Sequence, residues 1–173
     1  MSRSTLASLI RNIPDFPIPG VQFKDITTLL SNGPAFRELI GLFVERYRDQ
    51  QLRAIVGVES RGFILSAPLA YELGIGFVPV RKLGKLPGET VRLEYALEYG
   101  TNTLEMHRDA LAPGERVIIL DDVLATGGTV AAAAGLVEML DAEIVELAFL
   151  IELPFLKGRA QLTGRPIFSL LEF

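Results

Sequence analysis

Two neighbouring carboxylates and a glycine-threonine loop stand together in one short stretch of the chain, residues 117–129. Four apolar residues, 117–120, predict a buried strand, and Asp121 and Asp122 follow it at the start of a loop. An alanine-rich segment after the loop predicts a helix that ends at Leu140. A loop between a strand and a helix binds anions, because free N–H groups and the positive end of the helix dipole favour negative charge there.

The residues of this loop suit a phosphate group, and the two acids before it suit a sugar. The loop consists of Ala125, Thr126, Gly127, Gly128 and Thr129. Its glycines let the backbone close around an oxyanion, and its threonine hydroxyls can donate hydrogen bonds. The acids would repel a phosphate, but they accept hydrogen bonds from a pair of sugar hydroxyls. We therefore predict a phosphorylated sugar as the ligand.

A second junction between a predicted strand, 54–58, and a predicted helix, 63–73, carries a guanidinium group. The residues of the junction are Glu59, Ser60, Arg61 and Gly62. An arginine binds phosphate oxygens through two parallel hydrogen bonds, so the junction predicts a second anion site. A capped helix start with a surface arginine is the alternative.

Residues 81–92 combine positive charge with glycine and proline. The charged residues are four bases and one acid, which gives a local charge of +3 in a chain of net charge −4: Arg81, Lys82, Lys85, Arg92 and Glu89. A solvated charged loop is one interpretation. The other is a mobile lid that excludes water and neutralises a leaving group, and the glycine and proline at positions 84, 87 and 88 favour it.

The rest of the chain alternates between strand and helix patterns. Further strands are predicted at 76–80, 144–151 and 167–171, a hairpin at 91–107, and helices at 6–13 and 34–47. We predict one α/β domain over residues 1–173, with a mostly parallel sheet and helices on both faces. A hood over about residues 1–33 and a mobile loop with a hairpin over 81–100 complete it. Because ligands of such sheets bind beyond the carboxyl ends of the strands, the loops after Val58, Val80 and Leu120 are expected at one crevice.

Composition excludes several classes of function. The chain has no cysteine, which removes disulfides, cysteine-zinc sites and thiol nucleophiles. A net charge of −4 argues against a nucleic-acid or membrane surface as partner. No uncharged apolar run is long enough to span a membrane, and the first residues lack the pattern of a secretory signal. We predict a cytoplasmic protein.

Residues 117–129 resemble, at every motif position, the signature of the type I phosphoribosyltransferases: an apolar run, two acids, two apolar residues, a small residue and Thr-Gly-Gly-Thr. They do not form a Walker A loop, because no Lys-Ser/Thr pair follows. The resemblance implies that Asp121 and Asp122 hold the ribose diol of phosphoribosyl pyrophosphate and that residues 125–129 hold its 5′-phosphate. It also implies Mg²⁺, bound through substrate oxygens and water without a direct protein ligand.

The same resemblance identifies residues 59–62 as the pyrophosphate loop, with a cis peptide bond between Glu59 and Ser60. Arg61 and Lys85 would stabilise the departing pyrophosphate, while Arg81 would reach the pyrophosphate of a neighbouring subunit in a homodimer. The implied substrate-binding residues in this part of the chain are Glu59, Ser60, Arg61, Arg81, Lys82 and Lys85.

The acceptor base follows from a missing acid. Family members that use 6-oxopurines place an acid where this chain has Ala125, so another carboxylate must exchange the proton on N7 if the acceptor base is a purine. Residues 97–100 resemble the motif of the members that use adenine, which implies that Glu98 is the general acid/base and that Tyr99 contacts substrate.

Residues 16–26 resemble the adenine-binding hood of the same members. Phe16 would stack on the base, and the backbone at Gln22 and Lys24 would read its edge. The implied reaction transfers the 5-phosphoribosyl group to adenine and gives AMP and pyrophosphate, a step of purine salvage. The alternatives are transfer to xanthine or another purine, and a non-catalytic regulator that binds phosphoribosyl pyrophosphate.

Overall fold

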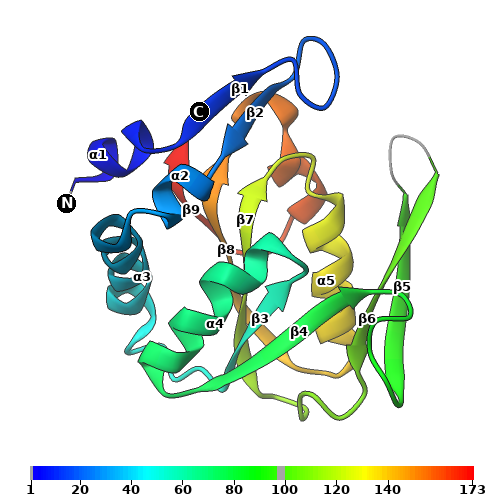
Figure 1. The fold of residues 1–173 in the computed structure, drawn as a ribbon. Coiled ribbons are helices and arrows are strands. Elements are labelled where there is room, and N and C mark those ends of the chain that lie inside the picture. Colours follow the sequence, from blue (N-terminus) through cyan, green and yellow to red (C-terminus); the bar gives the residue numbers. More distant parts are fainter. Residues whose placement is uncertain (1, 97–99) are drawn as a thin grey trace. The chain divides into compact units, whose positions relative to one another are not determined.

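The computed structural model, drawn in Figure 1, describes residues 2–96 and 100–173. The chain forms two compact units, Met1–Arg46 and Tyr47–Phe173. The hood predicted over about residues 1–33 falls within the first unit. Among the described residues, no helix has the length and apolar character needed to cross a membrane.

The first unit is built on a small antiparallel sheet. Its elements are α1 (Arg3–Ser8), β1 (Arg11–Pro14), β2 (Gln22–Asp25), α2 (Thr27–Leu30) and α3 (Gly33–Tyr47), whose last residue belongs to the second unit. Strands β1 and β2 pair from Arg11 opposite Asp25 to Pro14 opposite Gln22. The helix predicted through Ile13 was wrong beyond Ser8, because residues 11–14 form strand hydrogen bonds with β2 instead.

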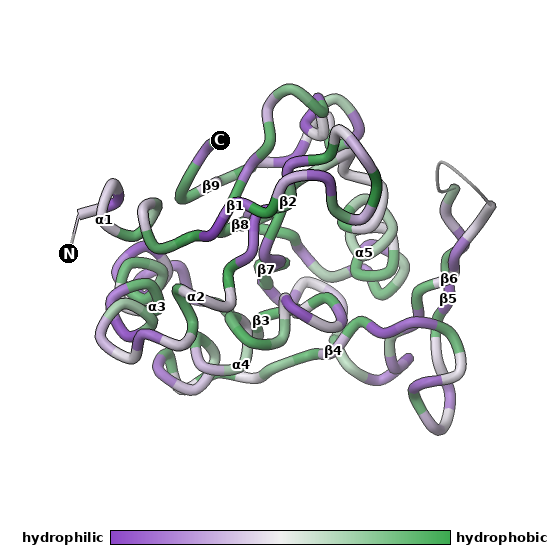
Figure 2. Tube along the Cα trace, turned by 45° about the horizontal axis from the view of Figure 1, so that its top comes forward, coloured by the Kyte–Doolittle hydropathy of each residue, from purple (hydrophilic) through white to green (hydrophobic). Residues whose placement is uncertain are grey.

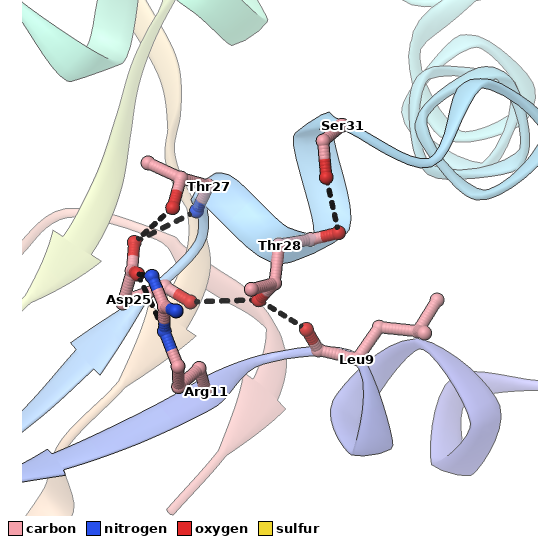
Figure 3. A network of polar contacts seen from close by, with 6 residues as sticks. All are labelled: Leu9, Arg11, Asp25, Thr27, Thr28 and Ser31. Atoms are coloured by element: carbon pink, nitrogen blue, oxygen red, sulfur yellow. Dashed lines mark hydrogen bonds and ion pairs between the residues drawn. The ribbon is translucent and has the colours of Figure 1, made fainter.

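A buried carboxylate stabilises this unit. Asp25 is 7% exposed and accepts hydrogen bonds from the backbone N–H of Thr27 (2.9 Å), the Thr27 hydroxyl (2.7 Å) and Arg11 Nε (3.0 Å), as Figure 3 shows. Beside it, the Thr28 hydroxyl donates to the Leu9 carbonyl oxygen at 2.6 Å. The hydrogen bonds from Thr27 and Arg11 lower the pKa of Asp25 to about 2.

Asp25→Asn is expected to reduce the free energy of unfolding at pH 7 by about 1–2 kcal/mol, allowing for the exposure of Arg11. Because the pKa of Asp25 is depressed on folding, its contribution is complete above the ordinary value of 3.8 and is lost as the pH falls towards about 2. Urea unfolding followed by circular dichroism at pH 7 and pH 2.5 tests this. Exposed Asp49 provides a control as Asp49→Asn. An equal loss for Asp25→Asn at both pH values would contradict the assignment.

The second unit is a seven-stranded sheet in the order β5-β6-β4-β3-β7-β8-β9. Its strands are β3 (Ala54–Val58), β4 (Gly76–Lys82), β5 (Thr90–Ala96), β6 (Thr101–His107), β7 (Arg116–Leu124), β8 (Glu143–Glu152) and β9 (Ile167–Glu172). Strands β4, β3, β7, β8 and β9 run parallel, and β5 and β6 form the predicted antiparallel hairpin. The hairpin extends to one side of the sheet in Figure 1.

Helices cover both faces of this sheet, as predicted. The helical elements are α4 (Arg61–Leu73), α5 (Gly128–Met139) and two short 3-10 helices, η1 (Pro154–Leu156) and η2 (Gly158–Leu162). All five residues of β3 are buried. Val56 faces one side of the sheet and belongs to the core cluster that includes residues of α5. The next residue, Gly57, faces the other side, where a Cβ atom on it would meet Ser66 of α4. Figure 2 shows the apolar colouring of the central strands, including β3. The predicted α/β architecture is therefore confirmed.

One predicted boundary was wrong in a way that affects the site. The sequence placed Asp121 and Asp122 in a loop, but β7 continues to Leu124. Pairing with β8 extends through Asp121 opposite Phe149 and Val123 opposite Ile151, so backbone hydrogen bonding carries the strand past the polar residues. Both acids consequently stand on a strand, and Asp122 is only 3% exposed.

Candidate functional site

The loop that follows β7 has the geometry of an anion site. Gly127 caps α5 in a left-handed conformation, with φ of 89°. Thr126 is exposed, and the Thr129 hydroxyl lies 3.5 Å from the hydroxyl of Tyr95 on β5. The first turn of α5 directs backbone N–H groups out of the helix end, as every helix N-terminus does. The predicted phosphate-binding loop is thus a strand-to-helix turn that can accept an anion.

The second predicted loop lies directly beside the two acids. Arg61 Nε is 2.7 Å from Asp122 Oδ2, and a Cβ atom on Gly62 would stand 2.9 Å from Asp121 Oδ1. The start of α4 therefore packs against β7, as the expected meeting of the loops after Val58 and Leu120 requires. Glycine at position 62 permits this close approach.

The paired acids have unusual electrostatics. Burial, together with the negative charge of Asp122, raises the pKa of Asp121 well above 3.8. Burial also raises the pKa of Asp122, and the positive charge of Arg61 opposes that shift. Asp121 Oδ1 accepts the backbone N–H of Asp122 at 2.8 Å. Within residues 2–96 and 100–173, Asp122 Oδ2 accepts no hydrogen bond, because its contact with Arg61 lacks hydrogen-bond geometry. This buried oxygen is an acceptor suited to a hydroxyl donor.

Glu59 links the second loop, residues 59–62, to the basic segment, residues 81–92. Its carboxylate accepts hydrogen bonds from Arg81 Nη2 (2.9 Å), Arg81 Nε (3.3 Å) and the backbone N–H of Lys82 (3.0 Å). The hydrogen bond from Arg81 lowers the pKa of Glu59. Arg81 also donates to the Lys85 carbonyl oxygen at 3.2 Å. The peptide bond between Glu59 and Ser60 is cis, which confirms that prediction.

A buried glutamate that the sequence analysis missed organises the loop between β4 and β5. Glu105 of β6 is fully buried, and Oε1 accepts the backbone N–H groups of Lys85 (3.0 Å) and Leu86 (2.9 Å). Oε2 lies 3.5 Å from Arg92 Nε. Burial alone would raise the pKa of Glu105, but the N–H groups of Leu86 and Lys85 outweigh it and hold that pKa below 4.5. No local pattern marks this residue, since its partners lie about twenty positions away.

Glu105→Gln is expected to lower the free energy of unfolding by about 1–3 kcal/mol, because two buried N–H groups would face a neutral amide. The amide protons of Lys85 and Leu86 should exchange faster with solvent, as hydrogen-exchange mass spectrometry would show. Exposed Glu89, in the same loop, is the matched control as Glu89→Gln. Unchanged exchange in Glu105→Gln would show that Glu105 does not order the loop.

The structure describes those predicted base-recognition residues that lie in the first unit. Phe16 is 51% exposed and packs edge-on against Phe23, with ring centroids 5.2 Å apart. The Gln22 side chain accepts a hydrogen bond from Asn12 Nδ2 at 2.6 Å, so it joins the two strands of the first unit. Lys24 stands opposite Asn12 in the same sheet. Glu98 and Tyr99 lie outside the described residues.

Comparison with known proteins gives one consistent family. Residues 25–164 match the phosphoribosyl transferase domain. The chain is 65% identical to the adenine phosphoribosyltransferase of Chloroflexus aurantiacus over 100% of both chains, and 66% identical to that of Roseiflexus sp. over 98% of this chain and 99% of the relative.

Solved structures agree with these relatives. Adenine phosphoribosyltransferase from Thermoanaerobacter pseudethanolicus is 50% identical, with a TM-score of 0.96 and coverage of 99% of this chain and 100% of that one. The enzyme from Saccharomyces cerevisiae, complexed with an imino-altritol bisphosphate and adenine, is 43% identical, with a TM-score of 0.93 and 98% of both chains covered. The chain therefore belongs to the adenine phosphoribosyltransferases, a branch of the phosphoribosyltransferase family.

Proposed function

We propose that this protein transfers the 5-phosphoribosyl group of phosphoribosyl pyrophosphate to adenine, giving AMP and pyrophosphate in cytoplasmic purine salvage. The observation that carries the proposal is the acid pair on β7, which stands between two loops built for anions. Asp122 Oδ2 is a buried acceptor beside Arg61, and the α5 N-terminus follows within a few residues. A ribose with a phosphate at one end and a pyrophosphate at the other matches this order of groups.

In this arrangement Asp121 and Asp122 accept the ribose hydroxyls, and residues 125–129 hold the 5′-phosphate that AMP retains. The hydroxyls of Thr126 and Thr129 and the N–H groups of the first turn of α5 supply donors. The sugar ring is thereby held at both ends, so its C1 atom faces the base in a defined orientation.

Pyrophosphate departs from the side of Arg61. We assign Glu59, Ser60 and Arg61 to its binding loop and Lys82 and Lys85 to the basic segment that faces it. The C1 centre becomes cation-like as the bond to pyrophosphate breaks, so fixed positive charge on the leaving group lowers the barrier without a covalent intermediate. Glu105 orders the backbone that presents Lys85.

The acid pair also suits a bound Mg²⁺ ion. Mg²⁺ prefers oxygen ligands, and Asp122 Oδ2, which pairs with Arg61 but accepts no hydrogen bond from the described residues, can orient a water of a hydrated cation or a hydroxyl that the cation polarises. Among the described residues, no three or more histidine, aspartate or glutamate side chains form a group that could hold a metal ion by themselves. Magnesium, when bound through substrate oxygens, would supply charge neutralisation at pyrophosphate.

The base is assigned to the hood and to residues 97–100. We propose that the two compact units act as one phosphoribosyltransferase domain, in which Phe16 and the backbone at Gln22 and Lys24 recognise adenine. Adenine N6 donates and N1 accepts, whereas a 6-oxopurine reverses the pattern, so backbone groups can discriminate between them. Glu98 would exchange the N7 proton, and Tyr99 would contact substrate.

A homodimer is the proposed assembly. The outer face of α4 exposes Ile64 (43%) and Tyr71 (83%), which stand two helical turns apart on one side. An apolar stripe on a helix is suited to burial against a second copy. In such a dimer Arg81 would leave Glu59 and reach the partner's pyrophosphate. Light scattering should give a dimer for the parent and a monomer for Tyr71→Glu; a monomeric parent would refute the dimer.

A direct activity screen tests the proposed function. Purified protein with phosphoribosyl pyrophosphate and Mg²⁺ is offered adenine, hypoxanthine, guanine and xanthine in turn, and nucleotide formation is followed by chromatography. We expect AMP from adenine and little product from the 6-oxopurines. A preference for xanthine or another purine would overturn the base assignment, and binding of phosphoribosyl pyrophosphate without turnover would favour a regulator.

A further inference from the structure

The segment between β8 and β9 lies against the phosphate loop. The Leu153 backbone N–H donates to the Leu124 carbonyl oxygen at 3.0 Å, just before that loop begins. A Cβ atom on Gly158 would stand 2.3 Å from the Ala125 carbonyl oxygen, and one on Gly127 would stand 2.5 Å from the Gly158 carbonyl oxygen. Both distances are too short for any side chain. Gly127 and Gly158 therefore meet backbone to backbone, and residues 152–162 form what we call the C-terminal clamp.

An ion pair between a buried carboxylate and a half-exposed arginine holds the clamp in place. Glu152, at the end of β8, is 5% exposed and accepts two hydrogen bonds from Arg159, one from Nε and one from Nη2, each at 2.6 Å. The Ser169 hydroxyl of β9 also donates to Glu152 at 2.6 Å. The hydrogen bond from Arg159 lowers the pKa of Glu152, so the carboxylate stays charged. Arg159 follows Gly158 directly, which fixes the position of that glycine relative to the sheet.

The other end of the clamp is equally constrained. Leu162 is fully buried in the core cluster that contains Leu124 and Val130, which flank the phosphate loop. Between the ion pair and this leucine, the clamp makes only a short 3-10 turn, Gly158–Leu162. A chain held this closely at both ends leaves the phosphate loop little freedom to move away from β8.

We propose that the clamp positions the phosphate loop, with Gly158 as the residue in contact and Glu152 and Arg159 as the pair that holds it. None of the three is assigned to contact substrate. The inference rests on the proposed role of residues 125–129 in binding the 5′-phosphate. A purely structural role would weaken folding alone; a positioning role changes affinity for the 5′-phosphate and leaves the pyrophosphate loop, on α4, unaffected.

Two ligands separate these roles in isothermal titration calorimetry. Ribose 5-phosphate probes the phosphate loop, and inorganic pyrophosphate with Mg²⁺ probes the loop at Arg61. Gly158→Ala should weaken binding of ribose 5-phosphate by on the order of 10- to 100-fold, because the added methyl group displaces Ala125. Pyrophosphate affinity should stay within two-fold, roughly the scatter expected of independent sites. Gly41→Ala is the control, since a Cβ atom there meets nothing within 4 Å.

A second variant covers the case in which Gly158→Ala does not fold. Arg159→Met should weaken ribose 5-phosphate several-fold, about 3- to 10-fold, and Arg159→Lys should recover part of the loss because it keeps one charged hydrogen bond to Glu152. Parent-like affinity for ribose 5-phosphate in folded Gly158→Ala or in Arg159→Met would overturn the clamp, as would equal losses for both ligands. If the parent itself bound no ribose 5-phosphate, the proposed function of the loop would fail instead.

Discussion

Glu98→Gln will slow single-turnover formation of AMP by roughly 10²–10⁴-fold. The amide keeps the size of the side chain and part of its hydrogen bonding, but it cannot exchange a proton with N7 of the purine. Ala125 stands where 6-oxopurine enzymes carry their acid, so no other acid of the recognised motifs is available for this step. Affinity for phosphoribosyl pyrophosphate should barely change, because Glu98 would contact the base.

Rapid-quench measurement of one turnover separates this chemistry from product release. Glu94→Gln is the matched control, because Glu94 is an exposed residue of the neighbouring strand β5, opposite Thr103. A Glu98→Gln rate within a few-fold of the parent would show that Glu98 is not the acid/base. Catalysis would then depend on positioning and leaving-group stabilisation.

Asp121→Asn is expected to make the protein more stable and a poorer binder of its substrate. The parent places two neighbouring carboxylates on one strand, and the pKa of Asp121 is raised by burial and by the charge of Asp122. Asparagine removes the charge and keeps the oxygen that accepts the Asp122 backbone N–H. Because the charged form of Asp121 is disfavoured in the folded protein, the free energy of unfolding should rise by on the order of 1 kcal/mol at pH 7. Affinity for phosphoribosyl pyrophosphate should fall by roughly 10- to 150-fold, the value of one charged hydrogen bond.

The pH dependence of this variant has a defined sign. Because the pKa of Asp121 is raised on folding, the folded parent binds more protons than the unfolded chain, so its stability falls as the pH rises above 3.8. The stability gain of Asp121→Asn should therefore be greater at pH 7 than at acid pH and should vanish below about pH 3.8. Urea unfolding across this range, with exposed Asp109→Asn as control, measures it. A variant less stable than the parent at pH 7 would show that the Asp121 charge is compensated.

Keeping the two acids charged reduces the folding stability of the protein. Burial raises the pKa of both carboxylates, and the charge of Asp122 adds to the shift at Asp121, so the charged pair costs folding free energy. Under the proposed function, hydrogen bonds from the ribose hydroxyls offset this cost. The stability of this strand and the affinity of the site should thus change in opposite directions when the charge is removed.

The local spacing of residues in the sequence was enough to predict much of the fold and of the candidate site. The order of strand, two acids and Thr-Gly-Gly-Thr loop indicated the family, which the comparisons confirm, and predicted a phosphoribosyl site, because each part acts through its own backbone and its immediate neighbours. The alternation of apolar strands and helices predicted the parallel sheet for the same reason: burial on both faces demands continuous apolar runs such as β3. The placement of Arg61 beside the acids followed from topology, since parallel strands end at one edge.

Tertiary structure decided what depends on partners distant in sequence. Strand β7 runs on through Asp121 because β8 continues to pair with it, and Glu105 is a structural carboxylate only because Lys85 and Leu86 present their N–H groups to it. The role inferred for Gly158 depends on its contact with Gly127, about thirty positions earlier in the chain. A sequence pattern reports propensity and periodicity, which are local, whereas these features arise from backbone groups that meet only after the chain has folded.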